Sequence, residues 1–298
     1  MTGHRIDVHA HFPIDLRRGV GSVEPWEAWD TPAALRHLDS FQIERQLLSM
    51  PVLPVGRVAR AVNDRFAQII SEAPDRFGAF ATVPGDDVDA ALAELRRALD
   101  DLGLDGLGLC SNVAGRYLGD PWFDPLLAEA ARRGVPVFVH PALNPAAAPL
   151  ALGRAPFLVE YPLDTFRTVV DAVYAGVFRR HPGLRMIVAH CGGALPALAW
   201  RVSSLADLAV PSAGGPSREE VQDALSRLYL DTALSGSPEV LHAASRLVGA
   251  DRLLYGTDSG AAPDAVIAAN DDGLARAGFS AEERAGVERH NAQALFGR

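Results

Sequence analysis

The sequence predicts an α/β protein, specifically a (β/α)8 barrel, and three observations lead to this fold. Eight short apolar or β-branched segments recur along the chain, and longer segments with helical spacing lie between them. Strands that alternate with helices usually pair in parallel. The length of 298 residues suits a barrel, which takes about 250 residues as one domain. We therefore expect residues 1–298 to form a single barrel domain, with an open doubly wound sheet as the alternative.

The predicted strands are runs of Val, Ile, Leu and aromatic residues. In chain order they cover residues 5–11, 45–51, 77–84, 106–112, 136–142, 185–191, 227–233 and 252–258. Segments 89–103 and 122–134 have apolar residues at i, i+3, i+4 and i+7 and end on glycine, which predicts amphipathic helices. Residues 141–157 are rich in proline and alanine, so we expect a long loop after the fifth strand, bordering the active site or forming a lid.

Composition excludes several classes of function. The chain contains no lysine, so all 28 cationic residues are arginine. A Schiff-base lysine, a phosphate-loop lysine and a carbamylated lysine bridging two metals are therefore excluded. The formal net charge of -9 and the lack of a basic run argue against nucleic acid as a partner.

The sequence also indicates the cellular compartment in which the protein works. No apolar run approaches the roughly 18 residues that cross a bilayer, and the first residues lack the pattern of a secretion signal. The two cysteines, Cys110 and Cys191, are too few for a disulfide framework. We therefore expect no membrane partner and a cytoplasmic location.

Five polar residues occupy the carboxyl ends of predicted strands. His9 and His11 end the first strand, where side chains two positions apart point the same way. His140 ends the fifth strand, His190 the sixth and Asp258 the eighth. A barrel gathers these ends around one mouth, where the active sites of this architecture lie. We therefore expect the five side chains to converge.

These residue types predict a metal centre. We expect His9, His11, His140 and Asp258 to bind one divalent metal, with a position left for water or substrate. Three imidazoles and one carboxylate suit zinc, with manganese or iron as alternatives. His190 is either a further ligand or, more usefully near neutral pH, a general acid or base.

Other residues near the predicted mouth have two interpretations each. Asp231 ends the seventh strand and either hydrogen-bonds a neighbouring histidine or acts in catalysis. Asp164 and Thr165 precede a helical run and predict an N-cap, although they also lie near the mouth. Arg201 either binds a substrate carboxylate or pairs with an acid on the outer helices. Phe12, directly after the histidine pair, is a second candidate substrate contact.

Seven segments in this order resemble the amidohydrolase-related family, also called amidohydrolase 2. They are "IDVHAHF", "RFGAFATVP", "YLGDPWFDPLLAEAARRGVPVFVHP", "GVFRRHPGLRMIVAHCGGALPALAWR", "LYLDTALSGSPEVL", "DRLLYGTD" and "NAQALFG". More narrowly, the chain resembles the branch of aminocarboxymuconate semialdehyde decarboxylase and 6-methylsalicylate decarboxylase. The resemblance implies a barrel, a homodimer and one divalent metal, commonly zinc. It puts the metal ligands at His9, His11, His140 and Asp258 and a catalytic histidine at His190.

Two motifs of this chain indicate which branch of the family it resembles. The last family motif usually reads Gly-Ser-Asp followed by an aromatic residue and Pro, whereas this chain has "GTDSGAAP". Ser259 and Gly260 thus replace bulk, which either widens the pocket or alters specificity. Some aromatic-acid decarboxylases of the family have Glu where this chain has His9, so His9 favours the zinc-type branch.

Together these features predict the non-oxidative decarboxylation of a small aromatic or unsaturated carboxylic acid, such as a salicylate-type ortho-hydroxy acid. Such a substrate can chelate the metal through its ortho group. Asp258 or His190 delivers the proton to the ring, or His190 deprotonates a water that attacks the ring system first. The alternatives are metal-dependent hydrolysis of a lactone or amide, and a barrel that has lost activity and only binds.

Overall fold

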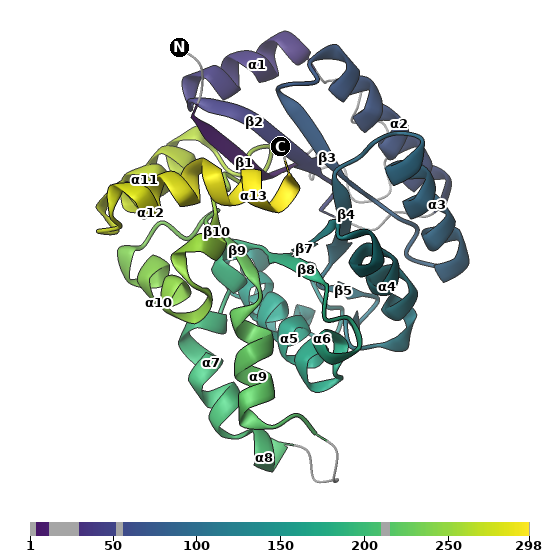
Figure 1. Ribbon diagram of the computed structural model, residues 1–298, viewed down its shortest axis with the longest axis vertical. Coiled ribbons are helices and arrows are strands. Elements are labelled where there is room, and N and C mark those ends of the chain that lie inside the picture. The colour runs from purple at the N-terminus through teal and green to yellow at the C-terminus, as the bar shows by residue number, and fades with distance from the viewer. Residues whose placement is uncertain (1–3, 12–29, 52–55, 210–214, 298) are drawn as a thin grey trace.

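The computed structural model describes residues 4–11, 30–51, 56–209 and 215–297 (Figure 1). Eight parallel strands form one sheet, and their spatial order follows the chain. They are β1 (Arg5–His11), β2 (Ile43–Ser49), β3 (Phe77–Ala81), β4 (Gly106–Cys110), β7 (Pro136–His140), β8 (Arg185–Val188), β9 (Tyr229–Asp231) and β10 (Leu253–Leu254). A doubly wound sheet would reverse its strand order partway, so this order confirms the barrel and excludes the alternative.

Helices surround the strands, with α2 to α4 on the right of Figure 1 and α10 to α12 on the left. They are α1 (Thr31–Ser40), α2 (Gly56–Glu72), α3 (Val88–Asp100), α4 (Asp124–Arg133), α5 (Glu160–Tyr174), α6 (Val177–Arg180), α7 (Leu195–Ser204), α8 (Ala206–Ala209), α9 (Arg218–Ser226), α10 (Pro238–Val248), α11 (Asp264–Arg276), α12 (Ala281–Ala285) and α13 (Asn291–Phe296). Within the described ranges, none of these helices is both long and apolar enough to cross a bilayer.

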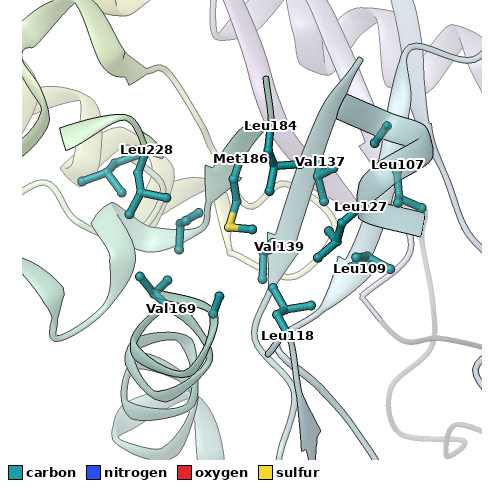
Figure 2. Packing of buried hydrophobic residues seen from close by; sticks show 14 of the residues in the cluster. Leu107, Leu109, Leu118, Leu127, Val137, Val139, Val169, Leu184, Met186 and Leu228 are labelled. Carbon is teal, nitrogen blue, oxygen red and sulfur yellow. The ribbon is translucent and has the colours of Figure 1, made fainter. Parts of the chain in front are cut away.

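The core has two layers because successive side chains of a strand point to opposite faces. In the outer layer, Val137 and Val139 of β7 pack with Met186 of β8 and Val169 of α5 (Figure 2). The inner layer fills the barrel and contains Phe138, which stacks on Phe80 of β3 with ring centroids 5.1 Å apart. Ala292 and Leu295 of α13 belong to this inner layer, so apolar packing closes the amino-terminal end of the barrel.

A bulge in β1 aims the histidine pair inward. The register of β1 against β2 shifts between Asp7 and Ala10. Because of this extra residue, Val8 belongs to the inner core layer while His9 also contacts the ring of Phe138, with centroids 5.0 Å apart. His11, two positions further on, points to the same side as His9. The histidine pair therefore faces the mouth of the barrel.

The segment 141–159 connects β7 to α5, two residues beyond the predicted loop 141–157, and contains the 3₁₀ turns Ala148–Ala151 and Pro156–Leu158. Asn144 ties its first part to a small hairpin of β5 (Asn112–Val113) and β6 (Arg116–Tyr117), because its side-chain amide donates to the Tyr117 hydroxyl at 2.8 Å. The later part of the segment carries large apolar side chains that are mostly exposed.

Candidate metal centre and active site

Four side chains from distant parts of the chain meet at the carboxyl ends of the strands. His9 and His11 come from β1, His140 from the end of β7 and Asp258 from the segment after β10. One ligand atom of each lies within 4.8 Å of the others, and all four residues are buried. Nε2 of His11 is 3.3 Å from Nε2 of His9, 3.1 Å from Nε2 of His140 and 2.9 Å from Oδ1 of Asp258. The predicted ligand set is therefore one cluster.

The cluster fits a single divalent ion. Ligand bonds of about 2.0–2.2 Å place neighbouring ligand atoms roughly 2.9 Å apart at right angles and about 3.3 Å apart in a tetrahedron. Within the described part of the chain, the buried Oδ1 of Asp258 contacts Nε2 of His11 without forming a well-aligned hydrogen bond, and the buried Nε2 of His190 forms none either. Buried polar atoms without a partner are costly, and a cation among them would supply one.

Hydrogen bonds from residues of β9 and β2 orient the two imidazoles of β1. Nδ1 of His9 lies 3.0 Å from Oδ2 of Asp231, and Nδ1 of His11 lies 3.1 Å from Oγ of Ser49. If Nδ1 of His9 carries the proton that Asp231 accepts, the lone pair on Nε2 is free to bind a metal. This contact corresponds to the hydrogen-bonding interpretation of Asp231, and its part in catalysis stays a prediction.

Burial and neighbouring charges determine the protonation states of the four cluster residues. Burial lowers the pKa of His11 and lowers that of His140 well below the ordinary value, so both imidazoles are neutral near pH 7. Burial alone would raise the pKa of Asp258, but the neighbouring imidazoles, His9 first, hold it well below its usual range. Burial would likewise lower the pKa of His9, but Asp231 and Asp258 raise it to about 10. Neutral imidazoles and an ionised carboxylate are the forms that bind metal, so His9, which is protonated near pH 7 in the metal-free protein, must release a proton when the ion binds.

His190 lies beside this cluster on a strained turn. β8 ends two residues earlier, and His190 begins a 3₁₀ turn instead of ending a strand. The φ angles of His190 and Cys191 are 56° and 52°, in the left-handed region that residues with a Cβ rarely adopt. The backbone N–H of His190 donates to Oδ1 of Asp231 at 3.1 Å, and its Nε2 is 3.5 Å from Oδ2 of Asp258. Asp231 thus contacts both His9 and the turn that carries His190.

The N-cap prediction for Asp164 and Thr165 is wrong. α5 begins at Glu160, so both residues lie inside the helix, and both are buried. Asp164 accepts hydrogen bonds from the Tyr117 hydroxyl at 2.8 Å and from Nδ2 of Asn112 at 2.7 Å. A buried carboxylate requires such donors, and the hairpin after β4 supplies them. Asp164 therefore joins α5 to the hairpin next to the mouth.

The two candidate substrate contacts stay predictions. Arg201 lies on α7 with an exposed side chain, and Phe12 lies outside the described residues. The sequence interpretation did not single out Asp7 or Ser49. An acidic residue inside an apolar strand was the available signal for Asp7, and the end of the second strand was the signal for Ser49.

Comparison with known proteins agrees with this fold and site. A model of the amidohydrolase family matches residues 6–298. The match covers nearly the whole chain, including all four residues of the cluster and His190. The chain therefore belongs to the amidohydrolase family.

Several relatives of the chain are named as decarboxylases of particular aromatic acids. The chain is 33% identical over 286 residues to the 6-methylsalicylic acid decarboxylase acuB of Aspergillus aculeatus, covering 88% of this chain and 86% of that protein. It is 29% identical over 324 residues to the gamma-resorcylate decarboxylase of Rhodococcus jostii, covering 98% and 97%. The structure of 2,6-dihydroxybenzoate decarboxylase from Rhizobium superposes with a TM-score of 0.84 at 26% identity, covering 100% of this chain and 99% of that chain.

Proposed function

We propose that this protein is a metal-dependent, non-oxidative decarboxylase of a small aromatic carboxylic acid with a hydroxyl group ortho to the carboxylate. The observation that carries the proposal is the buried cluster of three imidazoles and one carboxylate with a further histidine beside it. Relatives with this fold are named for acids of this kind, namely 6-methylsalicylic acid and 2,6-dihydroxybenzoate.

The residues present suit the chemistry of such an acid. A divalent metal held by His9, His11, His140 and Asp258 would supply Lewis-acid polarisation and fix the carboxylate and ortho hydroxyl. Loss of carbon dioxide from an aromatic carbon would leave an electron pair in the ring plane unless that carbon is protonated first. The protein must therefore hold an acid beside the ring. After protonation, the carbon–carbon bond breaks, carbon dioxide leaves, and the bonding electrons restore the aromatic ring.

Two groups can hold that proton. Nε2 of His190 and Oδ2 of Asp258 are 3.5 Å apart, so a small movement lets a proton pass between them. Nε2 of His190 has no other partner among the described residues, so this nitrogen is free to face a substrate. We propose that His190 donates this proton from Nε2 to the ring carbon, that Asp258 orients the imidazole from 3.5 Å away, and that a solvent proton restores the imidazole after the phenol leaves.

Carbon dioxide release tests the proposal directly. The purified protein is incubated with 6-methylsalicylate, 2,6-dihydroxybenzoate and salicylate labelled with ¹³C at the carboxyl carbon, and in parallel with lactones. We expect labelled carbon dioxide and the matching phenol from at least one acid. Hydrolysis of a lactone without carbon dioxide from any acid would replace decarboxylation with the hydrolytic alternative.

The finer features of the proposal are zinc, a homodimer and a cytoplasmic location. Three imidazole donors favour zinc, with manganese as the alternative, and elemental analysis of the purified protein distinguishes them. The large apolar side chains of Leu152, Phe157, Trp200 and Leu208 are 85%, 63%, 73% and 79% exposed, which favours burial against a second copy. Cys110 and Cys191 form no disulfide with each other, in keeping with a reducing compartment. We further propose that residues 1–298 form one domain.

A further inference from the structure

The seam between β10 and β1 carries three of the four metal-ligand candidates. Within the described residues, these two strands share no continuous ladder, and β10 is only two residues long. A few backbone hydrogen bonds close the barrel there, including Asp258 N–H to the His9 carbonyl at 2.8 Å and His11 N–H to the Ser259 carbonyl at 2.7 Å. The geometry of the cluster therefore depends on how this irregular seam is held.

Asp7 spans the seam with a single carboxylate. Its side chain is fully buried. Oδ1 accepts the backbone N–H of His9 and the backbone N–H of Thr257, each at 3.0 Å. Oδ2 accepts the hydroxyl of Thr257 at 2.6 Å and Nε2 of Gln46 at 2.9 Å. The carboxylate thus joins β1, β2 and the segment that follows β10.

On the β1 side, Asp7 fixes the bulge. The register shift lies between Asp7 and Ala10, and His9 is inside it. The hydrogen bond from the His9 backbone to Asp7 sets the direction in which the bulge turns, and so the direction of the His9 ring. A regular strand would place Val8 and His9 on opposite faces.

On the β10 side, Asp7 holds the backbone directly before Asp258 in place. Thr257 is the residue directly before Asp258, and both its backbone N–H and its hydroxyl bind Asp7. The same hydroxyl accepts the backbone N–H of Ser259 at 3.0 Å. Asp258 lies between these two anchored residues with φ at 60°, a left-handed conformation that the surrounding contacts must hold.

We propose that Asp7 is a positioning residue for the metal centre, whose carboxylate sets the place of His9 relative to Asp258 without touching the ion. The inference rests on the metal-binding part of the proposed function and is independent of the substrate. If the carboxylate only stabilised the fold, the loss of any one of its four hydrogen bonds would lower the stability of the protein and leave its metal affinity unchanged. A positioning role makes the bonds to Thr257 and His9 matter to the metal, whereas the bond from Gln46 matters only to stability, because β2 carries none of the four cluster residues.

Three variants separate these roles. Thr257→Val is isosteric and removes the hydroxyl that links Asp7 to the segment before Asp258. Asp7→Asn keeps the shape but replaces one acceptor oxygen with a donor that opposes Thr257 and Gln46. Gln46→Met is the matched control, because it removes one hydrogen bond from the same carboxylate on the side without a ligand. Zinc affinity is measured by competition with a chromophoric chelator, and the thermal unfolding of each metal-free protein is measured beside it.

We expect Thr257→Val and Asp7→Asn to bind zinc about tenfold more weakly or worse, in the range seen when partners of metal ligands are removed. We expect Gln46→Met to lower the unfolding temperature, by less than Thr257→Val because that variant also loses the hydrogen bond from Ser259, while keeping wild-type zinc affinity. The proposal is wrong if Thr257→Val binds zinc as the wild type does, or if Gln46→Met loses equal affinity. If Asp7→Asn does not fold, Thr257→Val against Gln46→Met decides alone. A wild-type protein that binds zinc but releases no carbon dioxide would refute the proposed reaction and leave this comparison valid.

Discussion

Asp231 is the residue at which the metal cluster and the His190 turn are joined. Its Oδ2 faces Nδ1 of His9 at 3.0 Å, and its Oδ1 accepts the backbone N–H groups of His190 at 3.1 Å and Ala233 at 3.0 Å. One oxygen therefore orients a ligand ring while the other fixes the backbone of the turn. Both effects require a carboxylate with acceptor capacity on each oxygen.

Asp231→Asn tests this arrangement at the residue scale. The amide oxygen will keep the backbone N–H groups, so its NH2 group will face Nδ1 of His9 and move the ring proton to Nε2, the atom that should bind the metal. We expect metal affinity to fall by about 10- to 100-fold, measured by titration of the metal-free protein. Ser49→Ala, which removes the neutral partner of His11, is the control, and an equal loss there would contradict a special role for Asp231.

His190→Gln separates metal binding from proton transfer. A glutamine keeps a polar side chain beside Asp258 but cannot hold and release a proton as an imidazole does. We expect the rate of decarboxylation to fall by about 10²- to 10⁴-fold, the usual contribution of a positioned acid, while the metal content stays at the wild-type level. Loss of the metal together with the activity would show instead that His190 is a ligand.

At the residue scale, the sequence predicted the cluster because strand ends in a parallel barrel share one mouth. His9, His11, His140 and Asp258 each end a recognisable apolar run. Asp7 was missed because its partners on His9, Thr257 and Gln46 are brought together only by the folded barrel, and no spacing in the sequence reports on them.

At the scale of elements, the turn that carries His190 is the least regular part of the site. His190, Cys191, Gly192 and Gly193 have φ angles of 56°, 52°, 75° and 62°. The first turn of α5 packs directly against it, and a Cβ at Gly193 would collide with the backbone carbonyl of Pro162. The turn and α5 therefore fit together only with glycine at this position.

Gly193→Ala should damage both stability and activity. The added methyl group forces either α5 or the His190 turn to move, and it also places a Cβ in the left-handed region. We expect a loss of about 2 kcal/mol or more in the free energy of unfolding and a lower kcat, measured by denaturant unfolding and steady-state kinetics. Gly134→Ala is the control, because Gly134 has φ at 66° with nothing within 4 Å of an added Cβ. It should cost about 1 kcal/mol with unchanged kcat, and an equal loss of kcat in both variants would contradict the account.

The sequence predicted which helices and strands exist better than it predicted the residues at which they begin and end. Periodicity identified α3 and α4, because their apolar faces and terminal glycines are local signals. It extended the sixth strand through Cys191, although β8 stops at Val188, because a left-handed turn that is hydrogen-bonded to Asp231 produces no periodic pattern in the sequence. It also misplaced the start of α5, where no side-chain cap exists to be recognised.

At the scale of the whole molecule, the barrel brings the carboxyl ends of its strands together. The polar site lies at these ends, next to the apolar inner core layer. Strand alternation and length were sufficient to predict this architecture. The ring of Phe138 lies 5.0 Å from His9 and 5.1 Å from Phe80, so the metal cluster rests on the inner core layer. The closing seam was beyond prediction because β10 and β1 meet through isolated backbone bonds and the Asp7 carboxylate, which depend on the folded barrel.

The most direct test of the proposed metal centre is the position of the metal in a crystal of the zinc-loaded protein, located by anomalous scattering at the zinc edge. We expect one strong peak at about 2.0–2.2 Å from Nε2 of His9, His11 and His140 and from a carboxylate oxygen of Asp258. A peak bound elsewhere, or a zinc-saturated crystal without density among these four residues, would contradict it.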